Sequence, residues 1–279
     1  MKTRIVLILL LAGAAALVPA ACGEGSEASP GAKNVVAGFY PLAFAAEQVG
    51  GSDVEVTNLT PAGAEPHDLE LSPRELEEIL GADLVVYAGG GFQPAVEEAV
   101  ESSDVKASDV LEGDADPHVW LDPVRFAQVV ERIGTELGAE PRARRLAARL
   151  QALDEDFRLG LADCERRELV TTHDAFGHLA DRYGLEVVPI AGIAPEAEPG
   201  PGDLEEIASL VEERGVTTVF TEPLLSPEIG ETVAREAGAT TAVLDPVEGL
   251  TEDDLDHGED YFSVMEANLD ALRTGLGCR

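Results

Sequence analysis

The chain has 279 residues and a formal charge of −35, from 54 acidic and 19 basic side chains. Such an acidic surface repels nucleic acid and attracts cations. We therefore expect no nucleic-acid partner. The length is enough for two domains of ordinary size.

The first residues have the pattern of a secretory signal. Lys2 and Arg4 form a positive start, residues 5–18 are apolar or small, and Ala20-Ala21-Cys22 follows. The apolar run is shorter than the ~20 residues that a membrane span needs. We predict a signal peptide over 1–21, and the ending resembles a bacterial lipobox with Cys22 as the lipidated first residue. The alternative is cleavage near Ala21, which leaves an ordinary thiol and an unanchored, periplasmic protein.

Residues 22–32 are rich in Gly, Ser, Glu, Ala and Pro, so they predict a flexible tether. A tether after a lipidated cysteine would hold the protein at the outer face of the cytoplasmic membrane. If Cys22 is lipidated, Cys164 and Cys278 remain as a pair. An even pair in an exported chain favours a disulfide, and the alternative is two buried thiols.

After the tether, short strand patterns alternate with helical ones. In the first half, we predict strands at 34–38, 53–59, 83–87 and 106–111, and helices at 41–49, 73–81, 94–102 and 124–137. Ser72 and Glu75 form a capping box around Pro73, and Asp122-Pro123 starts another helix.

A long segment, 141–164, is rich in Arg, Ala and Leu and predicts one helix of about six turns. The alternation then resumes. In the second half, we predict strands at 168–172, 186–190, 217–221 and 241–244, and helices at 175–183, 203–214 with Asp203 as N-cap, 227–237 and 261–276.

This alternation predicts an α/β fold with parallel sheets flanked by helices. Two such halves on either side of one long helix predict two similar lobes joined by a backbone helix. We place the N-terminal lobe at 33–138, the linking helix at 139–165 and the C-terminal lobe at 166–279.

Three of the five histidines lie next to the ends of predicted strands or the starts of helices. His67 follows the strand that ends at Leu59, His118 precedes a capped helix, and His173 directly follows a strand. Asp245 also ends a strand. Because open α/β sheets bind ligands beyond the carboxyl ends of their strands, these four residues predict a site between the lobes.

Three imidazoles and one carboxylate form a suitable set for tetrahedral Zn²⁺. Nitrogen-rich sites also suit copper, iron and nickel, whereas manganese prefers oxygen and calcium needs more oxygens than are present. His178 lies about 140° around a helix from His173, so we interpret it as a helix-surface residue or a support for a ligand. His257 lies in an acidic stretch that we interpret as a solvated loop.

At these residues the chain resembles the metal-binding lipoproteins of zinc and manganese ABC importers, the cluster A-I solute-binding proteins. The resemblance extends from Val35 to Cys278. The motifs that carry it are Gly63-Ala64-Glu65-Pro66-His67-Asp68, Ala82-Asp83-Leu84-Val85-Val86, Asp116-Pro117-His118-Val119-Trp120-Leu121-Asp122-Pro123, Thr172-His173-Asp174-Ala175-Phe176-Gly177, Pro195-Glu196-Ala197-Glu198-Pro199, Val219-Phe220-Thr221-Glu222-Pro223 and Leu244-Asp245-Pro246.

The resemblance implies a metal in the cleft between the lobes, held by His67 and His118 from the first lobe and His173 and Asp245 from the second. A histidine at the third position is typical of zinc-type members and a glutamate of manganese-type ones, so zinc is expected before manganese. The chain lacks the His-rich loop that many zinc-type members carry before the second ligand. It also has Thr218 where zinc-type members often have a cysteine.

The resemblance further implies a monomer that captures the metal and delivers it to an ABC importer permease, and no enzyme activity. One alternative is an exported zinc hydrolase with Glu65 or Glu222 as base, although the chain has no His-Glu-x-x-His motif. The other is an adhesin-like surface protein on the same scaffold, which binding to host matrix would reveal.

Overall fold

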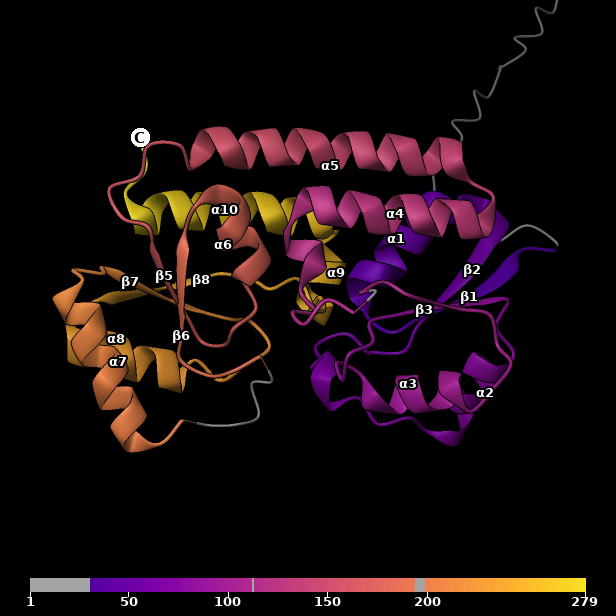
Figure 1. Cartoon of the computed structure of the whole chain (residues 1–279), viewed down its shortest axis with the longest axis horizontal. Helices are drawn as coiled ribbons and strands as arrows, with labels where there is room; N and C mark the ends of the chain where they lie inside the picture. The colour runs from indigo at the N-terminus through magenta and orange to yellow at the C-terminus, as the bar shows by residue number, and fades with distance from the viewer. Residues whose placement is uncertain (1–30, 112, 194–198) are drawn as a thin grey trace, which may run out of the picture.

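The structure is a computed structural model that describes residues 31–111, 113–193 and 199–279. Within these residues, two lobes lie side by side, each with a four-stranded parallel sheet flanked by helices (Figure 1). This arrangement confirms the predicted α/β fold. In the described residues, no helix is both long and apolar enough to cross a membrane. The predicted signal peptide and Cys22 lie outside the described residues.

The first lobe contains a sheet with strand order β2-β1-β3-β4. Its strands are β1 (Lys33–Ala37), β2 (Val54–Asn58), β3 (Leu84–Tyr87) and β4 (Ala107–Asp109). Its helices are α1 (Tyr40–Gly50), α2 (Pro73–Leu80), α3 (Pro94–Glu101) and α4 (Pro123–Leu137), with 3-10 turns η1 (Gly51–Asp53), η2 (Pro66–Asp68) and η3 (Val119–Leu121). The capping box at Ser72 forms as predicted.

The second sheet repeats the topology of the first, with order β6-β5-β7-β8. Its strands are β5 (Glu168–Thr171), β6 (Glu186–Pro189), β7 (Thr218–Thr221) and β8 (Thr240–Val243). The helices of this half are α6 (Gly177–Tyr183), α7 (Pro201–Glu213), α8 (Glu228–Ala237), α9 (Glu252–His257) and α10 (Tyr261–Leu276). The shared strand order agrees with the two similar lobes predicted from the alternation of strands and helices.

The long helix α5 (Glu140–Gly160) runs across both lobes, with α4 beneath it over one lobe and α10 beneath it over the other (Figure 1). One side of α5 is apolar because its buried residues recur every three or four positions. These residues are Ala143, Leu146, Ala147, Leu150, Leu153 and Phe157. At Gly134 of α4, an added Cβ would lie 2.4 Å from the Cβ of Ala143, so glycine permits the close approach of these two helices.

Alternation along the strands divides the core into layers. Val35 and Leu169 point into one large cluster that also contains the buried face of α5 and residues of α10. Their neighbours Val36 and Val170 point to the other side, into separate clusters beneath each sheet. The large cluster is therefore common to both lobes and holds them together along one side.

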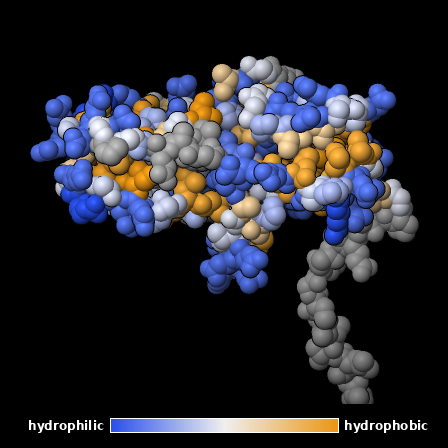
Figure 2. All heavy atoms as spheres, turned by 90° about the horizontal axis from the view of Figure 1, so that it is seen from below, coloured by the Kyte–Doolittle hydropathy of each residue, from blue (hydrophilic) through white to orange (hydrophobic). Residues whose placement is uncertain are grey.

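The opposite side of the molecule, covered by α2, α3, α7 and α8, carries a mixture of hydrophilic and hydrophobic residues on its surface (Figure 2). Exposed hydrophobic side chains include Leu76 and Leu80 of α2.

Three local predictions differ from the structure. Helix α7 starts earlier than predicted: Gly200 is the N-cap, and Asp203 is the third helical residue whose carboxylate accepts from the Gly200 N–H. Residues 252–257 form a helix and not the predicted loop, because Thr251 and Asp254 make a capping box. Helix α5 ends at Gly160, so Cys164 lies beyond it. The predicted lobe boundaries remain predictions.

Cys164 and Cys278 are joined by a disulfide that connects the segment after α5 to the end of α10. The two residues are 114 positions apart, so the bond would restrict a large loop of the unfolded chain.

We predict that the Cys164→Ser/Cys278→Ser variant loses about 2–4 kcal/mol of unfolding free energy, because its unfolded chain gains conformational freedom. Urea unfolding with and without a reductant measures this loss. The reductant should destabilise the wild type and leave the double variant unchanged. An equal response of both proteins would show that the pair is not bonded.

Candidate metal site

Four buried side chains converge where the two lobes meet. His67, His118, His173 and Glu248 each offer a ligand atom, and these atoms lie within 4.8 Å of one another. The side chain of His67 is 6% exposed and the other three are 0% exposed. Glu248 Oε1 lies 3.4, 3.0 and 3.6 Å from the Nε2 atoms of His67, His118 and His173. We call these four residues the cluster.

Asp116 orients the ring of His118, which stands before the 3-10 turn η3. Asp116 Oδ1 lies 2.7 Å from His118 Nδ1 and also accepts the backbone N–H of His118 at 3.0 Å. With Nδ1 held by a carboxylate, the Nε2 lone pair faces the cluster, which is the arrangement common for metal-binding histidines.

Glu222 does the same for His173. It follows β7, and its Oε2 lies 2.6 Å from His173 Nδ1. Its other oxygen accepts the His173 backbone N–H at 3.1 Å and the hydroxyl of Thr172. Because β5 and β7 are neighbours in the sheet, their ends bring the two side chains together. Glu222 therefore holds the His173 backbone by a hydrogen bond and faces the His173 ring as an ion pair.

His67 is held differently, by packing. It lies in the 3-10 turn η2, and its ring meets that of Phe92 edge to face at a centroid distance of 4.4 Å. Gln93 anchors the turn, because its side-chain amide donates to Pro66 O at 3.4 Å and to Gly38 O at 3.0 Å. The preceding loop is tied to the second half of the chain, since Gly63 N–H donates to Leu250 O at 2.9 Å.

Glu248 projects from the loop after β8, which is anchored on both sides. Asn268 of α10 donates to Asp245 O and accepts from Asp245 N–H, at 2.7 and 2.8 Å. Trp120, next but one to His118, donates its indole N–H to Pro246 O at 2.7 Å. Val247 has a positive φ of 57°, which is strained for a β-branched residue and turns the chain so that Glu248 enters the cluster.

The structure does not bring Asp245 into the cluster, where the sequence placed it. Its carboxylate Oδ1 accepts the backbone N–H of Val247 at 2.7 Å, so it shapes the loop that presents Glu248. Burial raises the pKa of the Asp245 carboxyl to about 7. The carboxylate of the cluster is Glu248, three residues further on.

The remaining histidines lie outside the cluster. His178 of α6 is buried, and its Nε2 lies 3.0 Å from Asp116 O, so it supports the residue that orients His118. Of the two interpretations of His178, a support for a ligand therefore fits its position better than a helix-surface residue. His257 is exposed at the end of α9 and lies beside Asp253.

The charges of the cluster depend on one another. Burial raises the pKa of the Glu248 carboxyl, but the three neighbouring imidazoles outweigh this effect and hold it well below its usual range. Burial lowers the pKa of His173, but Glu222 and Glu248 together raise it to about 10. Burial and the nearby Glu248 carboxylate raise the pKa of Glu65 to about 9. An ionised Glu248 is thus the negative centre on which the imidazoles converge.

The cluster fits a small transition-metal cation. Three imidazole nitrogens and one carboxylate match the ligands and number that tetrahedral Zn²⁺ takes. His67 Nε2, His173 Nε2 and Glu248 Oε2 are buried and make no well-directed hydrogen bond within the described residues. Since buried polar atoms normally have partners, these atoms are poised for a ligand.

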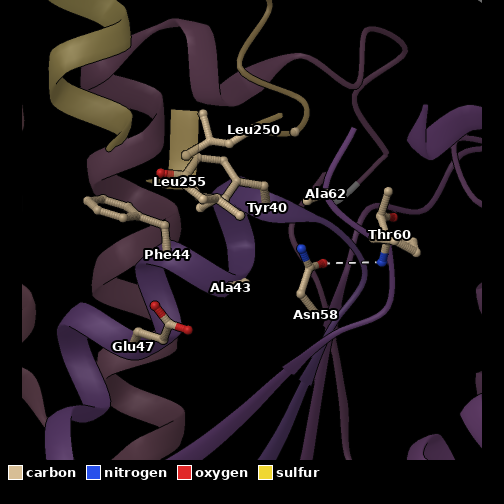
Figure 3. A pocket seen from close by; sticks show the side chains of 11 residues that line it. Tyr40, Ala43, Phe44, Glu47, Asn58, Thr60, Ala62, Leu250 and Leu255 are labelled. Carbon is tan, nitrogen blue, oxygen red and sulfur yellow. Dashed lines mark hydrogen bonds between the residues drawn. The ribbon is translucent and has the colours of Figure 1, made fainter. Parts of the chain in front are cut away.

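Figure 3 shows a groove whose lining includes Gly249, the residue after Glu248. Tyr40 and Phe44 of α1 line one side, and Leu250 and Leu255 line the other. None of the four cluster residues lines this groove. The groove is therefore a surface feature separate from the cluster.

Comparisons with known proteins agree with this geometry. The family model "ZnuA: Zinc-uptake complex component A periplasmic" matches residues 35–275. The high-affinity zinc uptake system protein ZnuA of Bacillus subtilis is 33% identical, over 96% of this chain and 97% of that protein. The zinc-binding lipoprotein AdcA of Streptococcus pneumoniae is 36% identical over 95% of this chain, but the match spans only 60% of AdcA.

Solved structures show the same architecture. The Zn(II)-bound ZnuA-like domain of Streptococcus pneumoniae AdcA is 36% identical, with a TM-score of 0.75 over 88% of this chain and 99% of that domain. The laminin-binding protein Lmb of Streptococcus agalactiae, described as an adhesin with metal-transporting activity, is 29% identical with a TM-score of 0.80, over 88% of this chain and 99% of Lmb. By the extent of the family match and its identity with these relatives, the chain belongs to the ZnuA family of solute-binding proteins for zinc uptake.

Proposed function

We propose that this chain binds zinc through His67, His118, His173 and Glu248 and delivers it to the permease of an ABC importer. The observation that carries the proposal is the convergence of three buried imidazole nitrogens on one buried carboxylate. The zinc-uptake family and the Zn(II)-bound AdcA domain support zinc as the metal.

The cluster suits storage of the ion better than catalysis. Four protein ligands fill a tetrahedral site, whereas catalytic zinc keeps a position for water. Glu222 is occupied with His173 and Thr172, so it is not available as the base of the hydrolase alternative. The protein would therefore act as a carrier and not as an enzyme.

Release requires the ligands from the two lobes to separate. Because one large apolar cluster joins both lobes beneath α5, only small relative movements of the lobes are favourable. Docking on the permease would supply such a movement and withdraw one or more ligands.

We also propose that Cys22 is lipidated and holds a monomer at the outer face of the cytoplasmic membrane. The lipobox-like Ala20-Ala21-Cys22 and the lipoprotein relative AdcA support the anchor. The likeness to the laminin-binding protein Lmb favours the adhesin alternative, and adhesion remains a prediction secondary to zinc capture.

The first test is metal content. The protein is stripped of metal, refolded, offered equal amounts of Zn²⁺ and Mn²⁺, and measured by mass spectrometry beside His173→Glu. We expect one zinc per wild-type chain, and in the variant loss of zinc or exchange toward manganese, because a carboxylate is a harder ligand than imidazole.

Manganese in the wild type would contradict zinc as the cargo and leave the carrier function in place. Absence of any stoichiometric metal would overturn the proposed function.

A second test separates the two candidate carboxylates. Glu248→Gln should weaken zinc binding by at least about 100-fold, the upper range for loss of a residue that only supports a ligand. Asp245→Asn should leave the affinity nearly unchanged, because the asparagine oxygen can still accept the Val247 N–H. Competition with a zinc-binding dye measures both variants, and the reverse order would show that Asp245 is the ligand.

A third test concerns Glu222. In Glu222→Gln, the oxygen should stay on the His173 backbone N–H, so the amide N–H₂ would face His173 Nδ1. The imidazole would then carry its proton on Nε2, where the lone pair for zinc is needed. We expect zinc affinity to fall about 10- to 100-fold.

The matched control is Glu228→Gln, an exposed residue of α8, which should bind zinc like the wild type. Equal affinities of the Glu222 and Glu228 variants would argue that Glu222 does not set the orientation of His173.

A further inference from the structure

The first half of α5 is basic in a chain that is otherwise strongly acidic. Between Glu140 and Asp154, the helix carries four arginines and no acidic residue. Its second half is acidic, with Asp154, Glu155 and Asp156. The helix is therefore polarised along its length.

Three of these arginines, Arg144, Arg145 and Arg149, are exposed on the outer side of α5, and we call them the arginine face. The fourth, Arg142, pairs with Asp53 at 2.6 Å. In the described parts of the chain, no carboxylate forms an ion pair with the arginine face. Arg145 donates only to Pro141 O, and Arg149 lies over the ring of Phe262 at 3.9 Å. The arginine face thus carries three exposed cationic groups that form no ion pair within the described residues.

The arginine face belongs to the half of α5 that starts at the end of the molecule where the described chain begins (Figure 1). Lys33, at the start of β1, donates to Leu137 O, the last residue of α4, at 3.0 Å. Helix α5 starts three residues after Leu137. Cys22 precedes Lys33 by eleven residues, which can span at most ~40 Å. A lipid on Cys22 would therefore keep this end of the molecule within about 40 Å of the bilayer.

We infer that the arginine face rests on anionic lipid headgroups while the protein is anchored, an inference that depends on the anchoring part of the proposed function. Clustered arginines near a membrane are attracted to anionic lipids, and the acidic remainder of the surface is repelled. Anchored in this way, the chain turns α5 toward the membrane and turns α2, α3, α7 and α8 toward the surroundings (Figure 1). The anionic lipid thus sets the orientation of the tethered carrier between visits to the permease.

The test measures which face lies near the bilayer. The mature chain from Cys22 onward is attached to vesicles through a maleimide lipid at Cys22, so the result does not depend on natural lipidation. An azide-bearing amino acid replaces either Ala148, on the outer side of α5, or Leu80 of α2, and carries a donor dye. Energy transfer to an acceptor dye in the bilayer reports proximity.

In phosphatidylglycerol vesicles, we expect more energy transfer from position 148 than from position 80. The difference should disappear in phosphatidylcholine vesicles and in 1 M salt, where the screening length falls to about 3 Å. It should also disappear in the Arg144→Gln/Arg145→Gln/Arg149→Gln variant. The matched control, Arg158→Gln/Arg214→Gln/Arg273→Gln, changes the net charge equally but removes arginines that already pair with carboxylates, and it should keep the difference.

Equal transfer from both positions, or a difference that persists in neutral vesicles, would overturn the inference. A loss of the difference in both triple variants would do so too, because net charge alone would then explain it. Mass spectrometry of Cys22 from cells and the zinc content of the same samples test the proposed function separately.

Discussion

The arrangement of the whole site depends on one buried carboxylate. The side chain of Glu248 is fully buried, and a buried charge is tolerated only when other groups compensate it. Three imidazoles provide that compensation, and they arrive from three separate segments of the chain. Each must therefore be delivered to within a few ångströms of the same oxygen, which requires both lobes to be in place.

The fold meets this requirement by dividing its core. Strand alternation sends one set of side chains into the common cluster beneath α5 and the other set into a separate cluster in each lobe. The common cluster fixes the lobes to each other, so Trp120 of the first lobe can reach Pro246 beside Glu248. Because this contact between the lobes lies close to the cluster, a small displacement of either lobe changes the positions of the ligand atoms. The capture and the release on docking that we propose would thus follow from the same stiffness.

Much of this fold was predictable because its signals are local. The alternation of strands with helices, the capping box at Ser72 and the Arg-, Ala- and Leu-rich composition of α5 depend on neighbouring residues. Their elements therefore appear within a few positions of the prediction. The predicted start of α7 at Asp203 and the predicted loop at residues 252–257 were wrong for a related reason. Asp203 and Asp254 can each serve as a cap or as the third residue of a capping box, and the sequence alone does not separate the two roles.

The limits of prediction are clearest after β8, where Asp245 and Glu248 both follow one strand. The strand-end rule locates the loop but gives no direction for its side chains. The direction comes from the positive φ of Val247, which a β-branched residue seldom adopts, and from Asn268, which lies 23 positions away. Asp-Pro did carry a signal of its own, since aspartate often accepts a backbone N–H two residues on. A carboxylate already used in such a turn is less available to a metal, so turn chemistry should be assigned before ligands are.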